Sequence, residues 1–264
     1  MLPVPDPLAD GGARPTVLAI DTTAGACSVA VTGPGGSASR SLPMTQGHSR
    51  HVLGLVEAVL REAGIAAGAV DAIGFGSGPG SFTGLRIACG IAQGLGFGWQ
   101  RPLVPVDAMR TLAVQAASDP GIEADWVLVA LDLRMGEVCM AAFRTEALAV
   151  GHWPDPELGP ALANPQAARA AFEALGAASP VLAGDGFDAY PSLLEGPLAT
   201  ARRPTRARQP DAAALAALAA LGLRSGRAVD AADAAPSYLR DKVALDVGEQ
   251  AALRAARAAG GGPR

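Results

Sequence analysis

The sequence has few aromatic residues and no excess of positive charge. Aromatic side chains make up 4% and charged side chains 17% of its 264 residues, and the formal net charge is −4. A protein that binds nucleic acid on its own uses a basic field to attract phosphates, and this composition does not supply one. Any role on a nucleic acid therefore requires a local basic patch or a partner.

Cysteine is also scarce, and no segment is typical of export or of a membrane span. Cys27, Cys89 and Cys139 lie far apart inside apolar segments, a spacing that offers neither a disulfide framework nor a metal-binding pair. The first residues lack the basic and apolar regions of a signal peptide. The longest apolar run, residues 212–223, is too short to cross a bilayer. We therefore expect a cytoplasmic protein with reduced core thiols and no membrane contact.

Half of the residues are hydrophobic, enough to bury one large core or two lobes. In the first part of the chain, β-branched runs and an apolar helical periodicity predict an α/β lobe that begins with a hairpin. We expect strands at residues 16–21, 27–32, 37–41, 70–76 and 103–106, and helices at residues 51–64 and 81–97.

The second part of the chain begins with a similar pattern. Residues 126–132 and 138–143 repeat the order of strand, carboxylate, turn and strand, which indicates an internally duplicated two-lobe fold. Later elements are expected at residues 165–175 (helix), 181–184 (strand) and 211–225 (helix), with a further helix after Val247. The predicted division is a tail at residues 1–14, lobes at 15–107 and 108–246, and a tail at 247–264.

Residues 73–86 read IGFGSGPGSFTGLR, with five glycines in fourteen positions. A dinucleotide-binding turn would need a third glycine where Ser81 stands, and a phosphate-binding Walker loop would need lysine where Leu85 follows Gly84. Both nucleotide interpretations fail on these residues. The glycines could simply permit the backbone angles of a strand-to-helix turn that contains Pro79.

The helix after this turn carries two rows of small residues. Each mid-helix glycine costs about 1 kcal/mol relative to alanine, so close backbone contact is expected in return. One alternative is a docking face formed with the helix at residues 51–63, and the other is a wholly internal helix. The rows are Gly84, Ala88, Ala92 and Gly96, and Gly90, Gly94 and Gly98. The residues expected at a partner interface are Leu55, Val59, Gly84, Ala88, Ile91, Ala92, Gly94 and Leu95.

Two acidic turns are weak candidates for binding phosphate. Asp21 and Thr22 end the first strand, and Asp132 holds the corresponding place in the second lobe, with Arg134 close by. Phosphate turns of this kind use glycine N–H groups directly after the acid, and Gly25 comes too late for that. These residues are therefore expected to be vestigial, and an autonomous ATPase or small-molecule kinase remains the alternative.

The remaining polar candidates have ordinary explanations. His48 and His51 are three residues apart but lack an adjacent acid, so capping or surface positions are favoured over metal binding. Ser49 and Ser81 are expected to cap helices. The basic loop could contact tRNA phosphates in an assembly, or be a solvated loop. It contains Arg202, Arg203, Arg206 and Arg208.

Four segments together resemble the bacterial TsaB (YeaZ-type) family, the non-catalytic partner of the TsaD threonylcarbamoyl-transferase. They read LAIDTTAGACSVAV, HSRHVLGLVEAVLREAGI, GFGSGPGSFTGLRIACGIAQGLGFG and LDLRMGEVCMAAF, and PSYLR at residues 236–240 adds to them. The resemblance implies a duplicated two-lobe actin-like fold (sugar kinase/Hsp70-type ATPase). It also implies a role in making N6-threonylcarbamoyladenosine next to the anticodon of tRNAs that read codons beginning with A.

The resemblance further implies a pseudoenzyme that binds and activates a TsaD-type catalytic paralogue as a heterodimer. A TsaE-type ATPase would be the third subunit, tRNA would be reached only through the complex, and a homodimer of the isolated protein stays open. No cofactor of its own is expected, although ATP or ADP could bind at a shared subunit interface.

A metal site is not expected either. The paralogue holds its metal with a His-x-x-x-His pair, and Ala108 and Leu112 stand at those positions. Neither side chain can donate a lone pair to a metal, which also weighs against a metallopeptidase.

Overall fold

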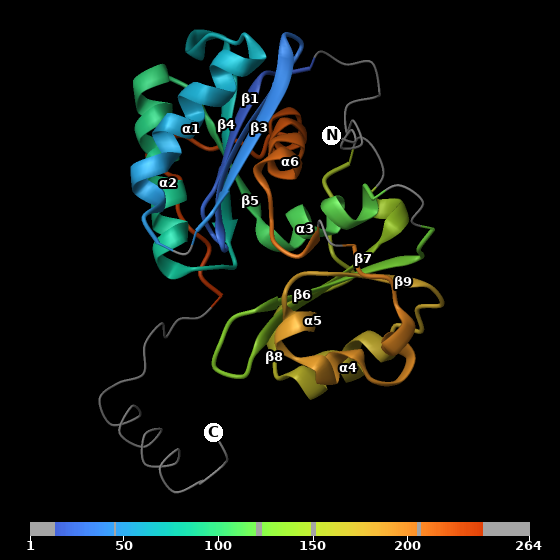
Figure 1. Cartoon of the computed structure of the whole chain (residues 1–264). Coiled ribbons are helices and arrows are strands. Elements are labelled where there is room, and N and C mark those ends of the chain that lie inside the picture. The colour runs from blue at the N-terminus through green and yellow to red at the C-terminus, as the bar shows by residue number, and fades with distance from the viewer. Residues whose placement is uncertain (1–13, 45, 120–122, 149–151, 205–206, 240–264) are drawn as a thin grey trace, which may run out of the picture.

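The computed structural model describes residues 14–44, 46–119, 123–148, 152–204 and 207–239, which form two lobes (Figure 1). A five-stranded sheet in the order β3-β2-β1-β4-β5 forms the first, and a four-stranded sheet in the order β8-β7-β6-β9 forms the second. The strands are β1 Val17–Asp21, β2 Ala26–Gly33, β3 Gly36–Pro43, β4 Ala72–Gly78, β5 Leu103–Asp107, β6 Trp126–Asp132, β7 Val138–Arg144, β8 Leu158–Ala163 and β9 Pro180–Ala183.

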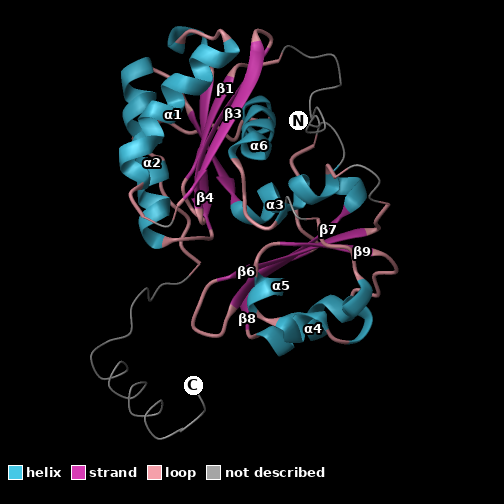
Figure 2. Cartoon of the chain, in the orientation of Figure 1, coloured by secondary structure: helices cyan, strands magenta, loops and turns pink. Residues whose placement is uncertain are grey.

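Helices cover the sheets on both sides (Figure 2). The α-helices are α1 His48–Ala63, α2 Phe82–Trp99, α3 Ala108–Ala117, α4 Pro165–Glu173, α5 Gly186–Ala189 and α6 Ala212–Arg224. Short 3-10 helices are η1 Ala67–Ala69, η2 Thr145–Leu148, η3 Pro191–Leu194 and η4 Gly196–Thr200. None of these helices is both long and apolar enough to cross a membrane in the part of the chain that is described.

The first sheet is covered by α1 and α2 on one face and by α6 on the other (Figure 1). Because successive strand residues point to opposite faces, Leu18 and Ile20 join the core beneath α1 and α2. Val17 and Ala19 join the core beneath α6. β1 pairs antiparallel with β2 and parallel with β4, so a hairpin leads into a parallel sheet. Although α6 falls in the range expected for the second lobe, it packs on the first sheet.

The second sheet repeats the arrangement of the first four strands. β6 pairs antiparallel with β7 and parallel with β9, as β1 does with β2 and β4. One face packs against α3, and the other packs against α4 and α5 through Phe172 and Phe187. The common order of third, second, first and fourth strand confirms the duplicated two-lobe α/β fold of the actin-like type.

Most of the elements expected from the sequence are confirmed. The hairpin, the helix that Gly64 ends with φ 67°, and the later strands and helices lie within a few residues of their expected bounds. Several elements were missed: α3, where the Asp107 carboxylate accepts a hydrogen bond from the N–H of Arg110, β8, the short helix α5 and the 3-10 helices. The helix expected after Val247 lies outside the described residues.

Candidate functional site

The glycine-rich turn between β4 and α2 lies directly against the turn between β1 and β2. The N–H of Ser81 donates to the Thr23 carbonyl at 2.7 Å, and the Thr22 hydroxyl donates to the Gly84 carbonyl at 2.7 Å. A Cβ added to Gly80 would lie 2.5 Å from the Thr23 carbonyl oxygen, and one added to Gly84 would overlap the Thr22 carbonyl. These glycines therefore allow two backbones to meet, and they do not form a phosphate cradle.

This packing buries Asp21. Its Oδ1 accepts hydrogen bonds from the N–H and the hydroxyl of Thr23, at 2.8 and 2.9 Å, whereas Oδ2 has no partner among the described residues. Burial raises the pKa of the Asp21 carboxyl to about 7, since the charged form loses its solvation. Asp21 and Thr22 are 2% and 0% exposed. Both side chains are therefore enclosed in this structure, which favours vestigial turn residues, and a phosphate-binding role for them stays a prediction.

The corresponding turn of the second lobe is open but is held by its own hydrogen bonds. Asp132 Oδ1 accepts from the N–H of Arg134 at 2.7 Å and from the hydroxyl of Tyr190 at 3.0 Å. The N–H of Asp132 donates to Asp185 at 3.0 Å. Arg134, Met135 and Gly136 all have left-handed φ values of 64°, 61° and 81°. Asp132 thus fixes a strained turn, and that role accounts for its carboxylate without a phosphate.

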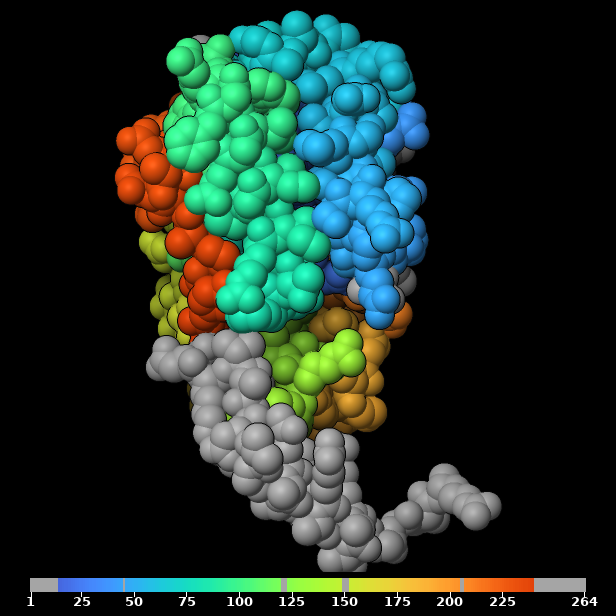
Figure 3. Space-filling model, turned by 90° about the vertical axis from the view of Figure 1, so that its left-hand side faces the viewer, coloured from blue at the N-terminus to red at the C-terminus, as the bar shows by residue number. Residues whose placement is uncertain are grey.

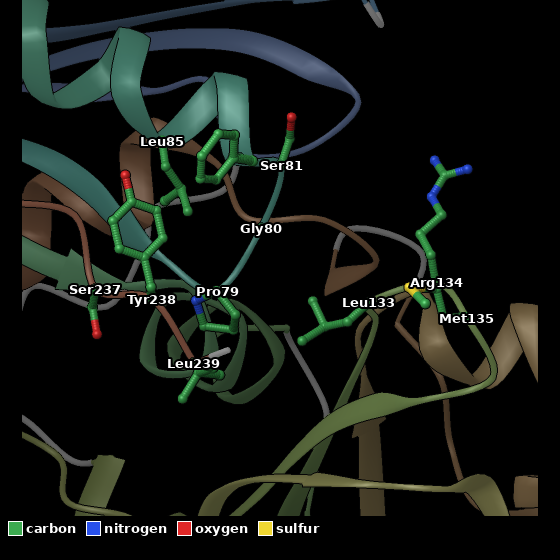
Figure 4. Close-up of a pocket in the computed structure, with 11 residues that line it drawn as sticks. Pro79, Gly80, Ser81, Leu85, Leu133, Arg134, Met135, Ser237, Tyr238 and Leu239 are labelled. Carbon is green, nitrogen blue, oxygen red and sulfur yellow. The ribbon is translucent and has the colours of Figure 1, made fainter. Parts of the chain in front are cut away.

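Between these two turns lies a pocket of about 310 Å³ (Figure 4). Its walls come from three parts of the chain: the glycine-rich turn with the start of α2, the β6–β7 turn, and the segment that follows α6. The lining residues are Pro79, Gly80, Ser81, Phe82, Leu85, Leu133, Arg134, Met135, Ser237, Tyr238 and Leu239.

Residues 227–239, which we call the C-terminal strap, return along α2. The Gln93 side chain donates to the carbonyls of Ala231 and Ala234, each at 3.1 Å. The N–H of Ser237 donates to the Ser77 carbonyl at 2.7 Å. The strap ends with the Tyr238 ring 5.6 Å from that of Phe82. The sequence did not predict these contacts, and its only signal there was the PSYLR motif.

The outward face of α2 is not covered by the other described residues. The first small-residue row is inside: Gly84, Ala88, Ala92 and Gly96 are all buried. The second row is outside, because a Cβ at Gly90, Gly94 or Gly98 would meet no described atom within 4 Å beyond the helix itself. In the space-filling view, α2 lies between α1 and the C-terminal strap with this face toward the viewer (Figure 3).

This arrangement corrects part of the expected interface. Leu55 and Val59 are 8% and 0% exposed, and their side chains pack in the core beneath α1. Gly84, Ala88 and Ala92 are buried too, so these five residues cannot offer contact to another protein while the lobe is folded. Gly94 is exposed, and Ile91 and Leu95 are half-buried. Two apolar side chains that were missed, Leu53 and Phe97, are 51% and 63% exposed.

The two positions at which the resemblance sets the paralogue's metal ligands lie in α3. Ala108 and Leu112 are buried in α3 and belong to the core of the second lobe. His48 is buried at the start of α1 and His51 is exposed. The described residues contain no group of three or more histidine, cysteine or acidic side chains that could hold a metal ion.

Of the remaining polar candidates, one serine caps a helix, and the described arginines of the basic loop lie at or near the surface. Ser81 caps α2 by accepting from the Gly84 N–H at 3.3 Å, as expected. Ser49 does not cap α1, because the helix begins at His48 and Gly47 takes the cap position. In the basic loop, Arg203 and Arg208 both pair with Asp188. Arg202 is exposed, and Arg206 lies outside the described residues.

Comparison with known proteins places the chain in a family. Residues 43–246 match the family model TsaD, tRNA N6-adenosine threonylcarbamoyltransferase. The chain is 34% identical over 229 residues to the tRNA threonylcarbamoyladenosine biosynthesis protein TsaB of Escherichia coli (strain K12), covering 86% of this chain and 96% of that one. The protein of the same name from Haemophilus influenzae is 41% identical over 123 residues, which are 47% of this chain and 51% of that one.

Solved structures agree with the sequence comparison. A structure described as YeaZ from Pseudomonas aeruginosa superposes with a TM-score of 0.71 at 34% identity, covering 85% of this chain and all of that one. A second structure from that organism, described as similar to peptidase YEAZ, has a TM-score of 0.73 at 35% identity, covering 86% of this chain and all of that one. The chain belongs to the TsaB (YeaZ-type) family.

Proposed function

We propose that this chain is a non-catalytic subunit in the synthesis of N6-threonylcarbamoyladenosine in tRNA, and that it binds and activates a TsaD-type catalytic paralogue. The names of its relatives place them in this biosynthesis. The main support for the docking role is the outward glycine row of α2. Glycines in the middle of a helix cost stability, and Gly90 and Gly94 gain no contact within the described chain in return.

A helix with such a row can receive another helix at short range, because no Cβ atoms keep the two backbones apart. Ile91 and Leu95 are half-buried on the same helix, and Phe97 and Leu53 add exposed apolar surface. A partner that covers this face can bury the area that stable complexes require, on the order of 800 Å² on each side. The docking face in this proposal consists of Gly90, Gly94, Gly98, Ile91, Leu95, Phe97 and Leu53.

The same observations support a non-catalytic role. Asp21 is sealed beneath the glycine-rich turn. Ala108 and Leu112, which the resemblance sets at the metal-ligand positions of the paralogue, are buried. The alternative of an autonomous ATPase or kinase draws no support from this geometry.

Within the proposal, ATP or ADP would bind at the interface between the two subunits. A TsaE-type ATPase would join as the third subunit, and tRNA would be contacted through the complex. Self-association of the isolated chain is left open.

The test is binding of the TsaD-type paralogue encoded in the same genome, measured by calorimetry with the thermal unfolding of each variant alongside. Gly94→Leu should weaken binding about a hundredfold, or about 2.7 kcal/mol, while the isolated variant unfolds as the wild type does. Ala170→Leu is the matched control, since Ala170 is an exposed small residue on α4 of the other lobe. Equal binding by wild type and Gly94→Leu would remove this face from the proposal.

A second measurement addresses catalysis. The isolated chain should neither hydrolyse ATP nor modify tRNA, and adding it to the paralogue should raise formation of the modified adenosine. ATP turnover by the isolated chain that disappears in Asp21→Ala would support the kinase alternative instead.

A further inference from the structure

We infer that the pocket between the two lobes is an anchor site for an acidic and apolar segment of the catalytic partner. A carboxylate of that segment would pair with Arg134, and a neighbouring apolar side chain would enter the pocket. The inference rests on the proposed function and extends it, because it adds a second contact region to the docking face on α2.

The pocket has the composition of an anchor site. Leu85, Leu133 and the rings of Phe82 and Tyr238 supply apolar walls from three separate parts of the chain. Figure 4 shows Leu133 and Arg134 across the cavity from Leu85 and Tyr238. A volume of about 310 Å³ lies at the lower end of the range for small-molecule sites, roughly 300–1,000 Å³. It suits one or two side chains, and buried aromatic or aliphatic anchors contribute most of the binding energy of many interfaces.

Among the described residues that line the pocket, the only charged one is Arg134. None of the eleven described residues that line it is acidic, and Arg134 is exposed at its rim. No ion pair joins Arg134 or Arg86 to a carboxylate in the described part of the chain. The Arg86 guanidinium instead lies 3.5 Å from the centre of the Phe82 ring and 5.8 Å from that of Tyr238. Two cations beside an apolar cavity are complementary to a segment that carries a carboxylate next to an apolar residue.

The pocket is continuous with the docking face. Arg86, Gly90 and Gly94 are four residues apart on α2, and all three are exposed, so they lie in one row along the helix. Phe82 is one turn before Arg86 and lines the pocket. A partner that lies along this row therefore reaches the mouth of the pocket at the first turn of the helix.

The β6–β7 turn presents Arg134 in a fixed position. Its N–H donates to Asp132, whose Oδ1 also accepts from Tyr190, and the turn is closed by a hydrogen bond from the Leu133 N–H to the Glu137 carbonyl at 3.1 Å. A left-handed backbone at Arg134 costs energy for any side chain except glycine, and these hydrogen bonds offset that cost. A pre-organised arginine loses less freedom when it binds a carboxylate.

The test compares charge reversal at the two ends of one hairpin. Arg134→Glu should weaken binding of the paralogue at least tenfold, and the loss should shrink at high salt. Arg134→Gln should also weaken binding of the paralogue, by a smaller factor. Arg144→Glu is the control, because Arg144 is exposed at the other end of β7 and should change affinity less than twofold. Tyr238→Ser, which removes an apolar wall, should also weaken binding with little change in the unfolding temperature.

Each outcome decides between the pocket and the docking face. If Gly94→Leu abolishes binding while both Arg134 variants bind within twofold of the wild type, the pocket inference is wrong and the proposed function stands. If the wild type does not bind the paralogue, both fail. If Arg134→Glu changes only self-association of this chain, or only its affinity for inorganic phosphate, the occupant is a second copy or a free anion, and the inference is likewise overturned.

Discussion

Replacing the two central glycines of the outward row by alanine should make the isolated protein more stable and its complex weaker. Gly90 and Gly94 lie in the middle of α2, and neither φ value is left-handed. A Cβ added to either would meet no described atom within 4 Å outside the helix. Alanine therefore keeps the helical backbone, introduces no clash and reduces the conformational entropy of the unfolded chain.

The magnitude follows from the helix scale. Each substitution should raise the free energy of unfolding by about 1 kcal/mol, so Gly90→Ala with Gly94→Ala should add about 2 kcal/mol. For a chain of this size the gain corresponds to roughly 4–8 °C in the unfolding temperature. In the complex, the two new methyl groups should overpack a close helix contact at a cost of about 1–3 kcal/mol. That range corresponds to a loss of affinity of roughly 5- to 150-fold.

The assay is thermal and denaturant unfolding of the isolated variants, together with calorimetric titration against the paralogue. Gly84→Ala is the matched control from the inner row, where a Cβ would overlap the Thr22 carbonyl, and it should lower stability. A double variant that binds as tightly as the wild type would refute the close helix contact. A double variant that is less stable than the wild type would show that the row packs inside the chain after all.

Three further predictions concern the core, the buried acid and metal content. Ala88→Leu should lower the free energy of unfolding by about 1–3 kcal/mol, seen in denaturant titration, because Ala88 is 0% exposed. The pKa of Asp21 rises from 3.8 to about 7 on folding, so the folded state binds its proton more tightly. The free energy of unfolding should therefore fall by up to about 4 kcal/mol as the pH rises from about 4 to 7, and then level off. Denaturant titrations between pH 4 and 8 should show a flatter profile for Asp21→Asn. Elemental analysis should find far less than one zinc or iron per chain, because the described residues hold no metal-ligand cluster; a stoichiometric metal would contradict this.

Local patterns were sufficient for most of the fold. The hairpins, α1 and α6 have clear periodicity or β-branched runs with turn residues between them, and the structure places them as expected. The helix α3 was missed, because its residues Ala108 and Leu112 were interpreted only in terms of metal binding. β8 contains glycine, proline and alanine, residues with low strand propensity. Its strand conformation depends on pairing with β7, a contact between distant residues that no local pattern reveals.

The candidate site was harder to predict because it depends on which side of a helix faces the sheet. Both small-residue rows of α2 have the same spacing, and only the packed structure shows that Gly84 lies against the Thr22 backbone while Gly94 faces outward. For α1, apolar periodicity identified Leu55 and Val59 correctly as one face, but that face is covered by the chain's own sheet. The pocket joins residues more than 150 positions apart, such as Phe82 and Tyr238.

In the free protein, the two glycine rows of α2 differ in whether packing contacts offset the cost of glycine in a helix. In the inner row the glycines gain contacts inside the chain: a Cβ at Gly84 would overlap the Thr22 carbonyl, and one at Gly96 would crowd the Leu103 side chain at 2.9 Å. In the outer row the cost has the same size, about 1 kcal/mol per mid-helix residue, and the described chain supplies no compensating contact. Folded proteins are stable by only about 5–15 kcal/mol, so such a cost is a substantial fraction of the total. In the proposed complex, the compensating contact for Gly90 and Gly94 would come from a partner helix that approaches the backbone of α2 closely, because the described residues offer none.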